Sequence, residues 1–442
     1  MSVRKTGLLP PLSRRRLLQM GAAAGGLALS GGLAAPAVHG QTKQLRFLNS
    51  EPSQDSVAVM KRAAEAYEAE TGVQVQVDSV GPGEAWQKLQ AAIASGRPYD
   101  ISSLLFSAHV SLLADAGQLV PLNDLIARHD WGPRILFPVE GNHYWYPFDY
   151  NLNWIFYRKD LYAEKGLKVP ETQAEMLENC RALTEGNRFG AMHPLGSTSA
   201  TQWMSLGYMW ANQVSLLDDQ FRVVVDDATN KPRMMAYLDF MQQLNGAMPP
   251  GMTQAGFSEA LAQYSSNQVA HAPYAGRLIE YLERRAPDLV EHTGFFTYPS
   301  QDGETRAVNH GYDGWVVLNT PMAEESLKFM DWFTTNHYVN FLHAAPLHFQ
   351  PPRLDVYEDP RWREHPLIQK HGELVAFMRN LLEDDSILIR SVDTQGPTVD
   401  MRGGAIFESM AVPEALQNRI LRDMPADEAV EVCAESLREA LA

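Results

Sequence analysis

The chain has 442 residues, of which 45% are hydrophobic. A chain of this length is too long for a single hydrophobic core, since single cores stop growing at about 250–300 residues. Acidic residues outnumber basic ones by 53 to 37, and no run of Lys or Arg interrupts this excess. The composition predicts two domains and excludes a surface for nucleic acid or anionic lipid.

The N-terminus is typical of a twin-arginine export signal. The run Ser13-Arg14-Arg15-Arg16-Leu17-Leu18-Gln19 precedes an uncharged stretch from Met20 to Val38, made mostly of Gly, Ala and Leu. This stretch is too short and glycine-rich for a comfortable membrane span, and small residues near its end predict cleavage after position 37 or 40. An uncleaved anchor is the alternative. We expect residues 1–40 to be removed. They carry five basic residues and no acidic ones, so the exported chain that remains has a net charge of −21.

The next elements alternate between strand and helix. A strand at residues 45–48 precedes a helix that ends at Gly72, and Val73, Val75 and Val77 then alternate with polar residues. A second helix ends at Gly96, a strand covers residues 101–106, and a third helix ends at Gly117. This alternation predicts a parallel sheet covered by helices.

An aromatic, extended segment at residues 144–157 predicts the first crossing between two lobes. A capping box of Thr172 and Glu175 begins the second lobe's helices, which continue at residues 202–213, 231–245 and 256–266. A glycine-rich strand at 311–318 and a helix at 324–336 return to the first lobe, with a last crossing near 345–352. The predicted first lobe comprises residues 41–150 and 305–346, and the second comprises 151–304 and 347–442.

The two cysteines lie on apolar helical stripes. Cys180 follows Met176 and Leu177, and Cys433 precedes Leu437. This spacing favours two buried free thiols. A disulfide is the alternative in an oxidising compartment, and it requires the last helix to pack on the helix that begins near residue 172.

Several segments, in order, resemble the extracellular solute-binding proteins of family 1, which include maltose-binding protein. They are residues 66–75, 86–96 followed by Tyr99-Asp100-Ile101, 113–122, 156–161 and 269–274. Tyr99 replaces the family's usual Pro, and Asn267 and His271 replace a Gly and a Met. The resemblance implies an α/β, two-lobed periplasmic binding protein fold. Each lobe would hold a mostly parallel sheet flanked by helices, with the ligand cleft at the hinge.

The resemblance also implies a function. Such a protein captures a carbohydrate or sugar derivative and delivers it to the permease subunits of an ABC importer, as a monomer, without catalysis, cofactor or metal. Sugars are bound by aromatic stacking and by polar side chains in a desolvated cleft, and loops after strands are where such residues gather. The candidate ligand-binding residues are Glu51, Trp86, Ser107, His109, Asp149, Asn151, Trp203, Tyr274, Arg277, Tyr312, Asp313, Trp315 and His348.

Some of these residues have a structural role as the alternative to ligand binding. Core packing is the alternative for Trp86 and Trp315, a helix cap for Ser107, and a surface position for His109. Asp149 and Asn151 are expected beneath the ligand, at the hinge floor. The cluster Gly311-Tyr312-Asp313-Gly314-Trp315 is the strongest, because its glycines permit close backbone approach.

Other functions remain as alternatives. The mature sequence has no G-x-S-x-G elbow, no H-E-x-x-H motif and no closely spaced Cys/His ligand set, which argues against a hydrolase or metalloenzyme. A glycan-acting hydrolase stays an alternative, because its two catalytic carboxylates are defined by their distance in space and have no fixed spacing in the sequence. Within the binding class, a polyol or a glycerophosphoryl compound is the alternative ligand.

Overall fold

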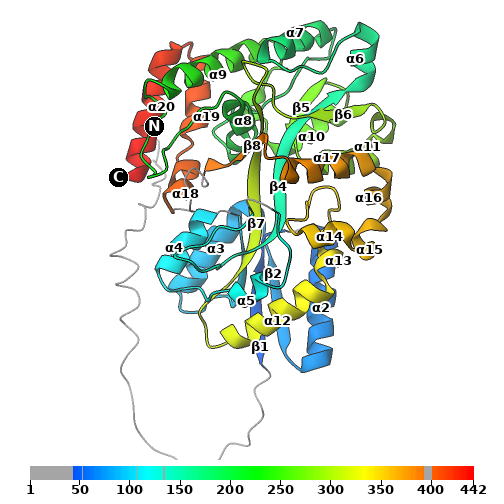
Figure 1. Ribbon diagram of the computed structural model, residues 1–442, viewed down its shortest axis with the longest axis vertical. Coiled ribbons are helices and arrows are strands. Elements are labelled where there is room, and N and C mark those ends of the chain that lie inside the picture. Colours follow the sequence, from blue (N-terminus) through cyan, green and yellow to red (C-terminus); the bar gives the residue numbers. More distant parts are fainter. Residues whose placement is uncertain (1–42, 52, 106, 133–134, 393–400) are drawn as a thin grey trace, which may run out of the picture.

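The computed structural model describes residues 43–51, 53–105, 107–132, 135–392 and 401–442, so the predicted export signal lies outside the described residues. Two lobes lie one above the other and are joined by two long strands, β4 (Tyr146–Arg158) and β7 (Arg306–Val317) (Figure 1). Within the described part of the chain, no helix is long and apolar enough to cross a membrane.

The first lobe is built on a sheet in the order β2-β1-β3-β7-β4. Strand β1 pairs in parallel with β2 and β3, whereas β7 runs antiparallel to β3. The elements, with β4 and β7, are β1 (Gln44–Asn49), α2 (Gln54–Thr71), β2 (Gln74–Ser79), α3 (Pro82–Ala94), β3 (Ile101–Leu104), α4 (Ser107–Asp115), α5 (Asn123–Ile126), α12 (Ala323–Asn336) and α13 (Tyr338–Leu342).

Local sequence explains where α2 begins and ends. The Ser53 hydroxyl accepts a hydrogen bond from the amide of Ser56, and Gly72 ends the helix with a left-handed φ of 75°. Between these ends, Val59, Met60 and Tyr67 are buried against the sheet. The predicted βαβ unit is therefore confirmed.

The second lobe continues the same two long strands. Strand β4 pairs antiparallel with β5 and β6, and β7 pairs in parallel with β8. The elements are α6 (Lys159–Lys165), α7 (Gln173–Leu183), α8 (Ser199–Ala211), α9 (Asn230–Asn245), η1 (Met252–Gln254), α10 (Phe257–Ser265), β5 (His271–Tyr274), α11 (Arg277–Arg285), η2 (Pro287–Leu289), β6 (Thr293–Phe296), α17 (Gly372–Glu383), β8 (Ile387–Arg390), α19 (Ala411–Leu421) and α20 (Ala426–Leu441).

The mixed α/β, two-lobed fold predicted from the sequence is confirmed, with more antiparallel pairing around β4 than the resemblance implied. The aromatic segment is one unbroken crossover strand. The glycine-rich strand begins earlier than predicted, at Arg306, because it pairs with β8 before it meets β4.

Residues 347–354 contact both lobes. The amides of Leu347 and His348 donate to Glu280 of α11, at 2.7 and 3.1 Å. Farther on, the Gly132 amide donates to the Pro352 carbonyl, and the Leu354 amide donates to the Asp130 carbonyl. The short helices α14 (Leu354–Glu358), α15 (Pro360–Arg363) and α16 (Pro366–Lys370) follow, and α18 (Met401–Glu408) packs on α4 of the first lobe. The exact lobe boundaries stay a prediction.

Cys180 on α7 and Cys433 on α20 are both buried and unpaired, so the disulfide alternative is wrong. Helix α9 packs against both α7 and α20. The free-thiol interpretation is the one the structure supports.

Candidate ligand-binding site

The floor of the site is the middle of the β4/β7 pair, where both strands pass from one lobe to the other. Their register places Asp149 opposite Asp313, Asn151 opposite Gly311 and Asn153 opposite Asn309. Side chains two residues apart on a strand lie on the same face. One face of the crossover therefore carries a row of carboxylates and amides with a gap at Gly311.

The two carboxyl groups of the floor lie close together, and Asp313 is half-buried. Asp149 is fully buried, and its Oδ1 accepts the amide of Asp313 at 3.2 Å. Burial, and then the negative charge of Asp313, raise the pKa of Asp149 well above its usual range. The pKa of Asp313 is raised to about 7, first by desolvation and then by the negative charge of Glu51. The positive charge of Arg277 acts in the opposite direction and lowers this pKa.

An ion pair joins the two lobes beside this floor. Glu51 follows β1 in the first lobe, Arg277 begins α11 in the second, and Arg277 Nη2 lies 3.3 Å from Glu51 Oε2. The two side chains are 15% and 26% exposed, so solvent reaches the cluster from this side. His348 lies near Arg277, and burial together with that positive charge lowers the pKa of His348 well below its usual range, which keeps the imidazole neutral.

Aromatic rings form the wall on the second-lobe side. The ring centroid of Trp203 lies 5.8 Å from that of Phe257 and 6.3 Å from that of Tyr274. The backbone carbonyl of Trp203 accepts hydrogen bonds from the side-chain Nδ2 atoms of Asn153 and Asn309, at 3.0 and 3.1 Å. The floor thus fixes the start of α8, and the Thr198 hydroxyl caps it. A Cβ at Gly311 would lie 3.7 Å from Trp203 Nε1, so the glycine keeps the floor low beneath the indole.

We call the polar floor, the Glu51–Arg277 ion pair with His348, and the aromatic wall together the crossover cluster. Its members come from β4, β7, α8, β5, α11 and the loops after β1 and α13. Of the predicted site residues it contains Glu51, Asp149, Asn151, Trp203, Tyr274, Arg277, Asp313 and His348.

Trp86 and His109 form a separate group. Their rings stack with centroids 3.9 Å apart and planes inclined by 5°, and His109 Nε2 lies 3.4 Å from Glu408 of α18. Ser107 begins α4 and Tyr312 lies in β7, but their side chains are outside what the structure describes.

Trp315 has the core position that was the alternative to its predicted role in ligand binding. Its side chain is 0% exposed and packs in the core of the first lobe. The rings around it are Phe47, Tyr146, Phe148, Phe333, Tyr338 and Phe341. Trp315 shares a strand face with Asp313, but helices α12 and α13 cover that face two residues farther along.

Four residues of the site escaped the sequence analysis. Asn153 and Asn309 continue the polar row, and the spacing Asp149, Asn151, Asn153 is the signal that could have revealed the first of them. Phe257, 39% exposed, and the buried Glu280 each lie on a helix, and no pattern distinguishes them from surface and core residues.

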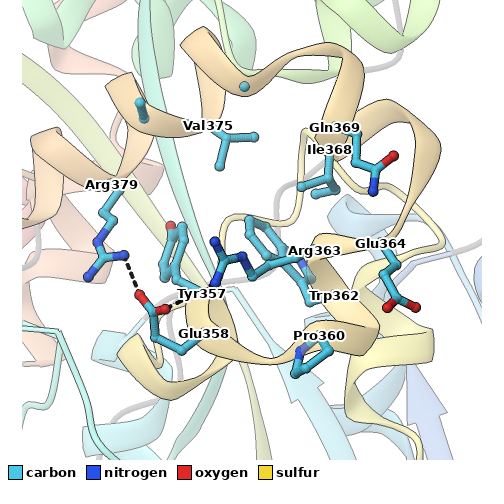
Figure 2. Close-up of a pocket in the computed structure, with 12 residues that line it drawn as sticks. Tyr357, Glu358, Pro360, Trp362, Arg363, Glu364, Ile368, Gln369, Val375 and Arg379 are labelled. Carbon is cyan, nitrogen blue, oxygen red and sulfur yellow. Dashed lines mark hydrogen bonds and ion pairs between the residues drawn. The ribbon is translucent and has the colours of Figure 1, made fainter.

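A surface cavity of about 650 Å³ lies elsewhere, among α14 to α17. Figure 2 shows Arg363 and Arg379, from different helices, directed at Glu358, to which they donate at 3.3 and 2.8 Å. No predicted site residue lines this cavity. Among the described residues, no group of three or more His, Cys, Asp or Glu is arranged to hold a metal ion.

The family model for bacterial extracellular solute-binding proteins matches residues 51–339. A comparison with curated protein sequences gave no significant match. Among solved structures, the sugar-binding protein MalE of Xanthomonas citri is 20% identical with a TM-score of 0.70, and the match covers 90% of this chain and 97% of that one. A ribitol-bound ABC transporter solute-binding protein of Agrobacterium radiobacter is also 20% identical, with a TM-score of 0.70 and coverage of 91% and 98%.

The GacH receptor of Streptomyces glaucescens, solved unliganded and with acarbose, is 20% identical with a TM-score of 0.72, and the match covers 90% of this chain and 98% of that one. At this identity the structures establish the fold. The family model spans well over half of the chain, and on that ground the chain belongs to the bacterial extracellular solute-binding proteins.

Proposed function

We propose that this protein is the exported solute-binding component of an ABC importer, which captures a carbohydrate or polyol at the crossover cluster and delivers it to membrane permease subunits. The observation that carries the proposal is the origin of the cluster: the two lobes supply its parts at the place where β4 and β7 cross between them. A ligand held there contacts both lobes at once, which is how binding is coupled to their relative position.

The chemistry of the cluster suits a polyhydroxylated ligand. Trp203, Tyr274 and Phe257 offer apolar faces, while carboxylates and amides offer acceptors for hydroxyl donors. Structural relatives were solved with maltose, with ribitol and with mannitol, which supports carbohydrates and polyols as the class to test.

A glycerophosphoryl ligand is less well supported. A phosphate group is best held by an arginine cluster or a helix N-terminus. Arg277 is the cation that faces the crossover cluster, and it already pairs with Glu51. A glycan hydrolase would use two carboxylates, and Asp149 and Asp313 are such a pair. Release of an unchanged ligand separates the binding protein from the enzyme.

The proposed location is the periplasm, after export through the twin-arginine pathway directed by residues 1–40. The proposed working form is a monomer without cofactor. The acidic mature surface favours solubility in that compartment.

The test is differential scanning fluorimetry of the mature protein against mono- and oligosaccharides, polyols, sugar phosphates and glycerophosphodiesters. A bound ligand raises the melting temperature by mass action. We expect an upward shift with a carbohydrate or polyol that mass spectrometry then recovers unaltered. A shift with phosphodiesters alone would favour the alternative ligand, and consumption of the compound would favour the enzyme.

A further inference from the structure

The crossover cluster contains more carboxyl groups than its own cation balances. Asp149, Asp313 and Glu51 lie near Arg277, the one arginine that acts on this group among the residues that the structure describes. The described residues form one ion pair in this group, Glu51 with Arg277, and none to Asp149 or Asp313. His348 does not supply the missing charge, because its imidazole is neutral.

Unpaired acceptor oxygens lie on the same face. Asp149 Oδ2 and Asn153 Oδ1 are both buried in fully buried side chains, and neither has a hydrogen-bond partner within the described part of the chain. The amide of Asn153 is oriented by the network, since its Nδ2 donates to the Trp203 carbonyl, so its oxygen is the free group. Buried acceptors without donors cost stability, and a bound ligand that donates hydrogen bonds removes this cost.

These two observations describe the complementary ligand. It donates hydrogen bonds, accepts few, and carries positive charge toward Asp149 and Asp313. A protonated primary amine has three N–H donors and no acceptor, as in a lysine side chain. The aromatic wall adds attraction, because a cation near an indole or phenol ring face is stabilised.

We propose that the solute is an amine-bearing carbohydrate or polyol, such as an amino sugar or aminocyclitol, whose ammonium group binds between Asp149 and Asp313. This inference rests on the proposed function and narrows its substrate class. The hydroxyl groups of the same solute then donate to Asn153 and Asn151, and its ring face lies against Trp203.

Proton release accompanies this mode of binding. Among the described residues, the titratable and charged groups around the ammonium position are Asp149, Asp313, Glu51, Arg277, Glu280, His348, Tyr274 and Tyr338. An ammonium ion beside Asp313 lowers the pKa of that carboxyl from about 7 toward its ordinary value. Near pH 7 the protein therefore releases protons when the amine binds, and a neutral sugar causes no such release.

The test compares matched ligands by isothermal titration calorimetry. The ligands are the amine, hydroxyl and N-acetyl forms of glucose, galactose and mannose, together with an aminocyclitol and inositol. We expect an amine form to bind about tenfold or more tightly than its hydroxyl and N-acetyl counterparts, which corresponds to about 1.4 kcal/mol. Titration in two buffers of different ionisation enthalpy measures the proton release.

The variant Asp149→Asn tests the site itself. Its Oδ1 still accepts the Asp313 amide, so we expect it to fold, but it removes one charge. The amine preference should then fall below about threefold, while Asp124→Asn, at an exposed carboxylate of α5, keeps it. A hydroxyl form that binds as tightly as its amine form overturns the inference and leaves the proposed function intact. If no form of any carbohydrate or polyol binds, the proposed function falls with it.

Discussion

Trp203 is the single side chain whose removal we expect to weaken solute binding most. Its indole lies beside Gly311 and two further aromatic rings, in the position for stacking on a sugar ring. Trp203→Ala should lower the affinity by about tenfold to a hundredfold, as loss of a stacking surface costs about 1.5–3 kcal/mol. Calorimetry with the identified solute measures this.

Trp203→Phe is the matched control, because it retains a ring and should keep most of the affinity. The start of α8 should persist in both variants, since Asn153 and Asn309 bind the backbone of residue 203 rather than its ring. Unchanged affinity in Trp203→Ala would contradict the placement of the wall.

Asp313 should make the stability of the unliganded protein depend on pH. Its pKa rises from 3.8 to about 7 on folding, because folding removes it from most of its solvent and places it near Glu51. The folded protein then binds more protons than the unfolded one between about pH 4 and 7. The contribution of Asp313 to the free energy of unfolding is therefore greatest below pH 4, and it falls as the pH rises to 7, by at most about 1.4 kcal/mol per pH unit.

Urea unfolding of the wild type and Asp313→Asn at pH 5, 6, 7 and 8 isolates this effect. The stability of the wild type relative to the variant should decrease between pH 5 and 7 and then level off. A relative stability that increases with pH would show that Asp313 is ionised and paired in the folded state.

At this scale the sequence predicted the polar floor better than the aromatic residues. Asp149, Asn151 and Asp313 lie on crossover strands, where a buried charge has few uses other than recognition. Trp315 resembles a site residue by its position beside Asp313, yet α12 and α13 cover it. Tertiary packing decides at which residue the helices begin to cover a strand face. The spacing of residues in the sequence does not reveal that position.

Helix α11 and the last crossing pack closely against each other at Gly276. A Cβ at Gly276 would lie 1.6 Å from the Leu347 carbonyl oxygen, and Glu280 of α11 accepts hydrogen bonds from the amides of Leu347 and His348. Gly276→Ala should therefore destabilise the protein by about 1–3 kcal/mol or more, since the backbone must shift. Solute affinity should fall as well, because Arg277 moves with the helix.

Gly81→Ala is the matched control. A Cβ at Gly81 meets nothing within 4 Å, and its φ of −63° suits any residue. Chemical denaturation of the two variants compares them directly. Equal free energies of unfolding for the two variants would show that the backbone near Leu347 can shift away from α11 without loss of stability.

Helices α7 and α20 bury the two cysteines, and this predicts their reactivity. Burial raises the pKa of the Cys433 thiol to about 12 and raises that of Cys180 further above its usual range. Because the thiolate is the reactive form, neither residue should be alkylated in the folded protein, and both should react in denaturant. Mass spectrometry after iodoacetamide treatment distinguishes this from a disulfide, which would react in neither state.

The elements themselves were largely predictable, because their signals are local. Thr172 and Glu175 form both bonds of the capping box that begins α7. The start of β7 was missed, since Arg306, Asn309 and His310 give no apolar alternation. Their strand conformation depends on pairing with β8 and β4, which come from distant parts of the chain.

For the whole molecule, the order of elements predicted where the chain crosses between lobes, but it did not predict the interactions that hold the lobes together. The structure holds the lobes together through the Glu51–Arg277 pair and through the contact of α18 with α4. The same arrangement places the half-buried Asp313 beside the fully buried Asp149, which is unfavourable while both are ionised. Without a solute, separation of the lobes would rehydrate these carboxylates.

We therefore expect the unliganded protein at pH 8 to be more open than the structure. Small-angle X-ray scattering should give a larger radius of gyration for the free protein than for the solute-saturated one, because the solute favours the joined state. Lowering the pH from 8 to 5 should reduce the radius of the free protein, since Asp313, with a pKa of about 7, becomes protonated and the repulsion decreases. Asp313→Asn should be compact at both pH values. A radius that changes with neither solute nor pH would show that the buried carboxylates do not govern how the lobes come together.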